Sequence, residues 1–256
     1  MSVAVVGVGV FVPGYPNAAA WLSRAQGIAQ PLPPTAALLD KHSRRRASVL
    51  TKALADAYGE ALQQAGLDGA RVASVFGMAL GEANTMIGLL DQMWRQDGSL
   101  SPMRFAASVH NAASGVVSIG TKNDRFTTSL GADFDTPAMA LFEAMAIAHA
   151  GEAVVIACGD EAAPADLVTD DQGWNFLTCA IALVPSELAA ISCPRLSMPQ
   201  RGEPTLTAAN VPRGLAQNPQ IGLLDLIGAL HDGRRGSIRL DRGRGRGYCV
   251  EITPPP

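Results

Sequence analysis

Short apolar segments alternate with amphipathic ones along the first two thirds of the chain. The Val-rich residues 3–12 form a segment too short for a helix, a pattern typical of a strand buried on both faces. Residues 48–65 keep apolar side chains at helical spacing, and Gly66 ends that helix. Other segments of the same two kinds predict strands at 72–80, 126–130, 153–158 and 176–184, and helices at 83–96 and 136–150.

Strands that alternate with helices favour an α/β fold. After Pro185 the pattern weakens into a loop rich in Pro and Thr, followed by a short helix at 221–230. Residues 237–240 and 248–252 then predict a closing hairpin. We therefore expect a main region over residues 1–190 and a short C-terminal extension over 191–256, packed on the same domain.

The strand, turn and helix over residues 126–150 have the layout of a nucleophile elbow, a sharp turn that presents one side chain above a sheet. The turn is predicted over 131–135, with Thr136 as the helix cap and Pro137 at its first position. The turn sequence Gly-Ala-Asp-Phe-Asp has neither the thiol nor the hydroxyl that acyl transfer requires. Its Asp133 and Asp135 are expected to stabilise the positive end of the helix.

Two further motifs have structural explanations. The pair Gly7 and Gly9 follows a strand, but the dinucleotide fingerprint needs a third glycine that opens a helix, and none follows. His110 and Asn111 lie in the small-residue stretch SVHNAASG, where we expect them to organise a loop through hydrogen bonds. The other histidines are isolated, so we expect no metal site and no cofactor.

Composition narrows the class of protein. The chain has 256 residues, of which 48% are hydrophobic and 17% charged, with a net charge of −3, so it is neither disordered nor globally attracted to nucleic acid or anionic lipid. No stretch offers about 20 unbroken apolar residues for a membrane span. The four cysteines are far apart, and Cys158 and Cys179 lie in apolar segments as small buried side chains. With no basic export region, these features predict a cytoplasmic location.

Arginines gather in two places. Arg44, Arg45 and Arg46 precede a predicted helix, and six arginines lie within residues 234–246, which include RGRGRG. Because no aromatic platform accompanies the second cluster, a solvated hairpin face is favoured over an RNA-binding module. The remaining interpretation is a patch that attracts the acidic surface or the phosphate of a carrier protein.

Six segments follow one another in order along roughly residues 1–190: VAVVGVGVFVPG, LPPTAALLDKHSRRRASVLTKAL, VASVFGMALGEANT, SVHNAASGVVSIGT, FTTSLGADFDTPAMALFEA and AVVIACGDE. In this order they resemble the β-ketoacyl synthase-like N-terminal family. They are similar above all to its short, chain-length-factor-like members found beside aryl polyene pigment synthases of the xanthomonadin or flexirubin type. The resemblance implies a thiolase-like fold that is truncated in its C-terminal half.

Departures from the family pattern indicate the role. In active synthases the elbow holds a cysteine, whose place here falls at or beside Phe134, and two histidine-containing motifs of the C-terminal half are absent. A chain without that thiolate forms no acyl-enzyme. The resemblance therefore implies a non-catalytic subunit that forms a heterodimer with a full-length β-ketoacyl synthase. An acyl carrier protein would contact it directly or through that partner.

The resemblance also implies two surfaces. A strand before the elbow would pair with the partner subunit, and a group of apolar side chains would line the partner's acyl tunnel. The pairing residues are Arg125, Phe126, Thr127, Thr128, Ser129 and Leu130, and the tunnel residues are Met86, Leu90, Met93, Phe105 and Phe134. The alternative is a stand-alone acyl-thioester transferase or hydrolase that uses Cys158 or Cys179, although their strand settings argue against it.

Overall fold

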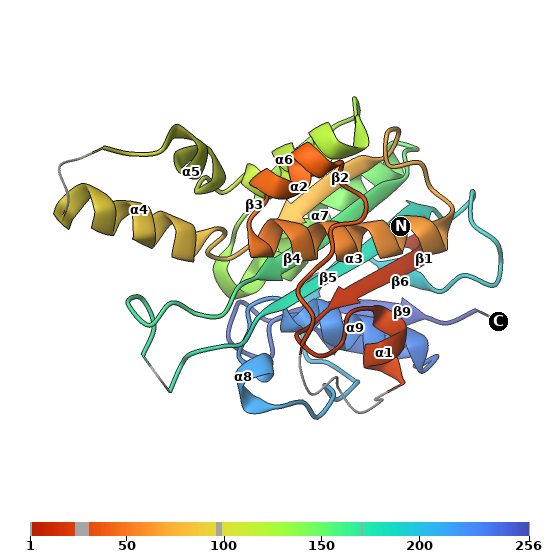
Figure 1. Ribbon diagram of the computed structural model, residues 1–256. Helices are drawn as coiled ribbons and strands as arrows, with labels where there is room; N and C mark the ends of the chain where they lie inside the picture. Colours follow the sequence, from red (N-terminus) through yellow and green to blue (C-terminus); the bar gives the residue numbers. More distant parts are fainter. Residues whose placement is uncertain (1, 24–30, 96–98, 170, 256) are drawn as a thin grey trace.

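The computed structural model describes residues 2–23, 31–95, 99–169 and 171–255 (Figure 1). Its centre is a mixed sheet whose strands follow the order β3-β2-β4-β5-β1-β6-β9-β7, with β8 paired to β9. The strands are β1 (Ser2–Phe11), β2 (Ala73–Gly77), β3 (Thr127–Leu130), β4 (Val154–Asp160), β5 (Leu177–Pro185), β6 (Arg195–Ser197), β7 (Gln200–Arg201), β8 (Gly236–Arg239) and β9 (Tyr248–Thr253).

Two parts of this sheet differ in strand direction. Strands β3, β2 and β4 run parallel, with Val75 of β2 opposite Thr128 of β3 and Ile156 of β4. The neighbouring pairs β4–β5, β5–β1, β1–β6 and β6–β9 are antiparallel. Every residue of β2 and β4 is buried, as expected for strands covered on both faces.

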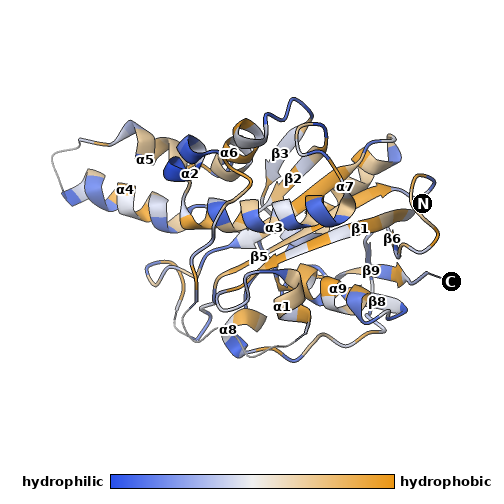
Figure 2. Ribbon diagram, turned by 45° about the vertical axis from the view of Figure 1, so that its right-hand side comes forward, coloured by the Kyte–Doolittle hydropathy of each residue, from blue (hydrophilic) through white to orange (hydrophobic). Residues whose placement is uncertain are grey.

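Helices cover both faces of the sheet. Helix α3 (Val49–Ala65) lies on one face and α7 (Thr136–His149) and α9 (Ile221–His231) on the other (Figure 1). Because strand side chains alternate between faces, Val75 packs on the α7 side and its neighbour Phe76 on the α3 side. The strands are largely hydrophobic, whereas α3 carries both hydrophilic and hydrophobic residues along its length (Figure 2).

The two glycines of β1 allow α3 to approach the sheet. A Cβ atom added to Gly7 would collide with the backbone oxygen of Ala61, and one added to Gly9 with the backbone oxygen of Ala57. Helix α3 begins where Ser48 Oγ accepts the Thr51 N–H at 2.9 Å. The Gly7–Gly9 motif therefore serves helix packing in this fold.

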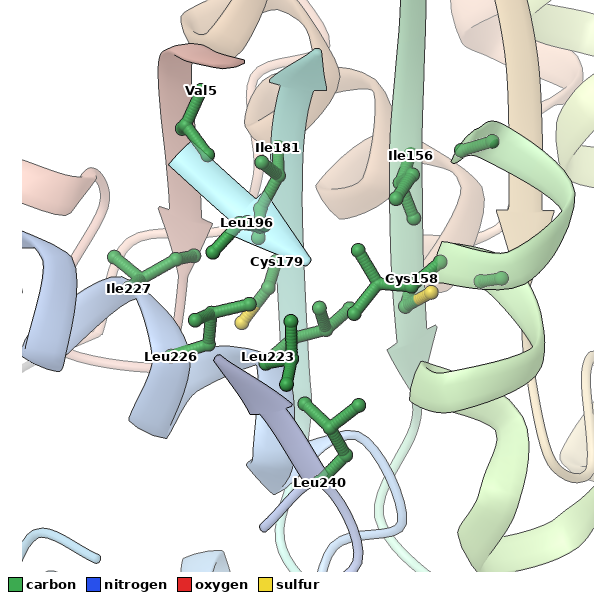
Figure 3. Close-up of a cluster of buried hydrophobic side chains, with 14 of the residues drawn as sticks. Val5, Ile156, Cys158, Cys179, Ile181, Leu196, Leu223, Leu226, Ile227 and Leu240 are labelled. Atoms are coloured by element: carbon green, nitrogen blue, oxygen red, sulfur yellow. The ribbon is translucent and has the colours of Figure 1, made fainter. Parts of the chain in front are cut away.

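The C-terminal extension completes the same sheet and core. Strand β6 pairs with β1, and β9 pairs with β6, so the sheet continues beyond its N-terminal strand. On the α7 face, Leu223 and Ile227 of α9 pack beside Cys179 and Ile181 of β5 (Figure 3). The extension thus adds helix α9 to the cover on the α7 face and adds strands to the edge of the sheet.

The remaining helices are short or project from the sheet: α1 (Ala18–Leu22), α2 (Lys41–Arg46), α4 (Ala83–Arg95), α5 (Pro102–Ala107), α6 (Ala112–Thr121) and α8 (Arg213–Ala216). Residue 96, the predicted end of the helix at 83–96, lies outside the described residues. Arg44, Arg45 and Arg46 precede helix α3, as predicted, and themselves form the end of α2. Two expectations were wrong: part of SVHNAASG belongs to α6, and Thr136 is the first helical residue of α7 rather than its cap.

Candidate functional site

The turn between β3 and α7 has the backbone of a nucleophile elbow. Asp133 adopts a left-handed conformation with φ of 52°, and a 3-10 turn over Asp133–Asp135 leads into α7. Thr136 Oγ1 accepts the Ala132 N–H at 3.0 Å and donates to the Asp133 carbonyl at 2.7 Å, which fixes the turn. The strained position of such elbows carries the nucleophile. In this chain Asp133 occupies that position. It lies directly beside Phe134, the residue predicted to lie at or next to the position of the nucleophile.

Phe134 is half-buried and contacts residues from two distant segments. Its ring meets Trp174 edge-on, with centroids 6.5 Å apart. The guanidinium carbon of Arg244 lies 4.2 Å from the same ring's centroid, a cation–π arrangement. A cavity of about 580 Å³ lies at this place, lined by elbow residues, Met139 and the segment from Arg244 to Arg246.

Asp135 binds the arginine-rich segment rather than the start of α7. Its side chain is buried, and Oδ1 accepts the backbone N–H of Arg246 at 2.8 Å. Arg246 Nε lies 3.5 Å from Oδ2, and Asp135 makes no side-chain capping bond to the helix. Asp135 is nevertheless the N-cap residue of α7, so stabilisation of the positive helix end by the charges of Asp133 and Asp135 stays a prediction.

Much of the RGRGRG motif is engaged with the fold. Arg242 forms a bidentate ion pair with buried Asp225, with Nε–Oδ2 at 2.7 Å and Nη2–Oδ1 at 2.6 Å. Gly243 and Gly247 adopt left-handed φ values of 84° and 79°. Both donate N–H groups to the carboxylate of Asp241, at 2.7 and 2.6 Å. The predicted solvated hairpin face is therefore wrong for Arg242, whereas residues 243–246 are exposed to solvent.

The strand before the elbow forms one edge of the sheet. Of the described strands only β2 pairs with β3, so the outer backbone edge of β3 has no strand beside it. On its inner side, Ser129 Oγ bonds Ser114 Oγ of α6 at 2.8 Å. Phe126, just before the strand, is 54% exposed, and Arg125 pairs with Glu152 at 3.2 Å.

Helices α4 and α5 extend beyond the sheet (Figure 1). Both helices carry exposed apolar side chains. Of the predicted tunnel residues, Met86 is 39% exposed, Leu90 and Met93 are 54% exposed and Phe105 is 59% exposed. Leu90 and Met93 share an open depression on α4. Phe134 lines the separate elbow cavity, so the structure of this single chain does not bring it together with them.

The predicted histidine–asparagine pair does not act as a unit. His110 Nε2 donates to the Met78 carbonyl at 2.9 Å, which ties the start of α6 to the end of β2. Asn111 is exposed, and its side chain makes no capping hydrogen bond. The loop-organising expectation is therefore wrong for Asn111.

Two buried acids beside these elements were not singled out from the sequence. Glu82, at the base of α4, accepts the hydroxyls of Ser48 and Thr51 at 2.5 and 2.9 Å, and burial raises its pKa. Asp160 accepts the backbone N–H groups of Ala79 and Leu80, both at 2.9 Å, and burial raises its pKa to about 6. Glu82 lies in a Gly-Glu pair beyond the end of β2, and Asp160 in the Gly-Asp pair that ends β4. Such pairs are too common in sequences to single out.

The candidate thiols are poor nucleophiles. Cys158 and Cys179 face each other across β4 and β5 and are fully buried in the core. Burial raises the pKa of both thiols, so the thiolate is strongly disfavoured. Within the described ranges, no three His, Cys, Asp or Glu side chains are grouped to hold a metal ion. No helix in that part of the chain is long and apolar enough to cross a bilayer.

Comparison with known proteins identifies the family of this chain. The family model for the β-ketoacyl synthase N-terminal domain matches residues 19–244. The chain belongs to this family. The family predicted from the sequence is thereby confirmed, and the match reaches beyond residue 190, where the sequence resemblance ended. A comparison with curated proteins found no match.

Solved structures of family members share the fold. A chain in the complex of the ketosynthase ApeO with its chain length factor ApeC, from Xenorhabdus doucetiae, is similar with a TM-score of 0.72 at 20% identity, over 99% of both chains. The ishigamide ketosynthase/chain length factor gives 0.57 at 17% identity, over 74% of this chain and 63% of that one. A type II polyketide synthase ketosynthase complexed with its acyl carrier protein gives 0.59 at 15%, over 73% and 64%. The ketosynthase-like, thiolase-type α/β fold is confirmed.

Proposed function

We propose that this protein is a non-catalytic, chain-length-factor-like subunit that works in the cytoplasm. It forms a heterodimer with a full-length β-ketoacyl synthase and lines that partner's acyl tunnel during aryl polyene or related polyketide synthesis. The elbow carries the proposal: its left-handed residue is Asp133, and residues 131–135 offer neither a thiol nor a hydroxyl. A carboxylate is a poor acceptor for an acyl group from a thioester, so condensation needs another subunit.

The edge strand and the apolar arm formed by α4 and α5 support pairing with a partner. An unpaired strand edge is a template for a strand of another chain. On α4, on α5 and just before β3, several large apolar side chains are about half exposed or more: Leu90, Met93, Trp94, Met103, Phe105 and Phe126. A surface of this kind marks a protein interface. The solved relatives that are described as ketosynthase and chain length factor complexes agree with such a partner.

A carrier protein is the second proposed contact. Helix α2 exposes Lys41, Arg44, Arg45 and Arg46 on one short segment, and none of them makes an ion pair with a described acid. Such a patch attracts an acidic protein surface and raises the rate of encounter. The similar structure of a ketosynthase with its acyl carrier protein agrees with a contact of this kind, made directly or through the partner.

Co-expression with a full-length ketosynthase tests the partner role. The expected result is a stable one-to-one complex, while the purified chain alone has no condensing activity. Leu90→Asp should weaken the complex at least tenfold because a charge then faces the apolar interface. Leu188→Asp is the matched control, since Leu188 is 69% exposed on a loop away from α4. Failure to bind any co-expressed ketosynthase, or equal effects of the two variants, would contradict the proposal.

A separate experiment tests the tunnel. Met86→Trp, or Leu90→Trp, in the active complex should shorten the polyene products, because a larger side chain fills the proposed tunnel wall. An unchanged distribution of chain lengths would remove the tunnel role and leave the partner role standing. The stand-alone alternative predicts acylation of Cys158 or Cys179 by a reactive thioester probe, against which their complete burial argues.

A further inference from the structure

The segment from Asp241 to Gly247, here called the strap, belongs to the C-terminal part of the sequence and packs against the elbow. We propose that the strap is a built-in closure that holds Phe134 in place and keeps bulky acyl thioesters away from the elbow of this subunit. The proposal deepens the proposed function and rests on it for its biological meaning, since a closed elbow leaves the acyl chain to the partner. Its structural basis is independent of any partner.

The strap is anchored at its own base. Asp241 is buried and accepts two N–H groups of the strap, which closes the loop on itself. Arg242 reaches inward to Asp225, whose side chain is only 1% exposed, and also donates to the Ala209 carbonyl at 2.9 Å. Ion pairs and hydrogen bonds in such buried positions are screened little by solvent. The base of the strap is therefore fixed relative to α9.

Its tip contacts the elbow at three successive residues. Arg244 stacks on the Phe134 ring and donates from Nη1 to the Gln217 carbonyl at 3.1 Å. Gly245 lies so close to the elbow that an added Cβ atom would collide with Asp135 Oδ1. Arg246 binds Asp135 through its backbone N–H and its guanidinium group. The arginines thus anchor the strap, Gly245 permits its close approach to the elbow, and Gly243 and Gly247 supply left-handed backbone positions.

These contacts limit access to the elbow. The strap residues 244–246 and the elbow residues 132–135, which contact each other, line the cavity together. Met139, on the first turns of α7, lies at the same cavity and is half-buried. A small reagent can enter this space, whereas a bulky one must displace the strap from Phe134 and Asp135.

Cysteine labelling of the full-length chain measures this access. In a Met139→Cys protein, the rates of modification by N-ethylmaleimide and by the larger fluorescein maleimide are followed by mass spectrometry of the peptide that contains residue 139. The rate ratio of the two reagents on glutathione serves as the reference. With the strap in place, the large reagent should be disfavoured at least tenfold relative to that reference.

Two independent variants should remove this selectivity. Arg244→Ala abolishes the contact with Phe134, and Gly245→Ala forces the strap away from Asp135. Either should bring the ratio to within about twofold of the glutathione value. The control Arg235→Ala, which changes an exposed arginine outside the strap, should leave the ratio unchanged. An unchanged ratio in folded Arg244→Ala or Gly245→Ala protein would overturn the closure. Because labelling needs no partner, this result is separate from the co-purification that tests the proposed function.

Discussion

Replacing Arg242 with alanine is expected to destabilise the protein far more than replacing a surface arginine. The Arg242–Asp225 pair is bidentate, and the two side chains are 16% and 1% exposed. Removal of one partner leaves a buried, uncompensated carboxylate, which costs roughly 3–5 kcal/mol. In a domain of this size that loss lowers Tm by roughly 10 °C. Urea unfolding and calorimetry measure both quantities.

The pH dependence identifies the cause of that loss. Burial raises the pKa of Asp225, and the hydrogen bond and charge of Arg242 oppose this rise. Without Arg242 the pKa rises further, so the carboxyl accepts a proton at mildly acidic pH and the penalty should be smaller at pH 5 than at pH 8. An Arg242→Met/Asp225→Leu double variant, which removes both charges, should recover most of the stability.

A surface pair provides the control. Arg95→Ala breaks the Asp91–Arg95 pair, whose side chains are 51% and 76% exposed, and should cost less than about 1 kcal/mol. A loss of only that size in Arg242→Ala, or a penalty that does not change between pH 5 and pH 8, would refute the assignment of a buried charge pair. In the Met139→Cys background, Arg242→Ala should also reduce the discrimination between the small and the large maleimide, because the strap loses an anchor.

Three further outcomes are expected. Gly9→Ala should destabilise the fold by more than about 2 kcal/mol in urea unfolding because its methyl group meets the backbone of α3, whereas Gly228→Ala, in open space on α9, should be neutral or stabilising. Because the pKa of Asp160 is raised, the folded state keeps a proton between about pH 4 and pH 6 that the unfolded state has lost. The free energy of unfolding should therefore fall as pH rises through this range, and it should fall less in Asp160→Leu. Cys158 and Cys179 should resist iodoacetamide until the protein is unfolded, and rapid labelling of either in the native state would contradict their burial.

Hydrophobic patterning was sufficient to predict the central elements. The strand predicted at 153–158 is β4, and the helix predicted at 48–65 is α3, because each has a strong and uninterrupted apolar period. Helix α6 was missed because Ala112, Ala113, Ser114 and Gly115 provide no large apolar stripe at helical spacing. Of these residues Ala112, Ala113 and Ser114 are buried against the rest of the fold, and such packing is a tertiary property.

The candidate site was less predictable because its contacts are long-range. Residues 131–135 showed the absence of a nucleophile, but nothing local indicated that Asp135 binds Arg246, which lies 111 positions away in the sequence. The arginine-rich segment has the composition of a solvated surface, and only the folded chain supplies Asp225 and Phe134 as partners. The edge position of β3 likewise depends on strand order, which local periodicity does not encode.

The position of β1 in the sheet has a consequence for biosynthesis. This strand lies between β5 and β6, so neither of its neighbours exists until the ribosome has added more than 160 further residues. During translation the apolar, Val-rich strand β1 therefore stays unpaired. Folding then depends on contacts between residues that are far apart in the sequence, and such contacts slow folding. We therefore expect a nascent chain that depends on trigger-factor-like or other holdase chaperones until the last strands emerge.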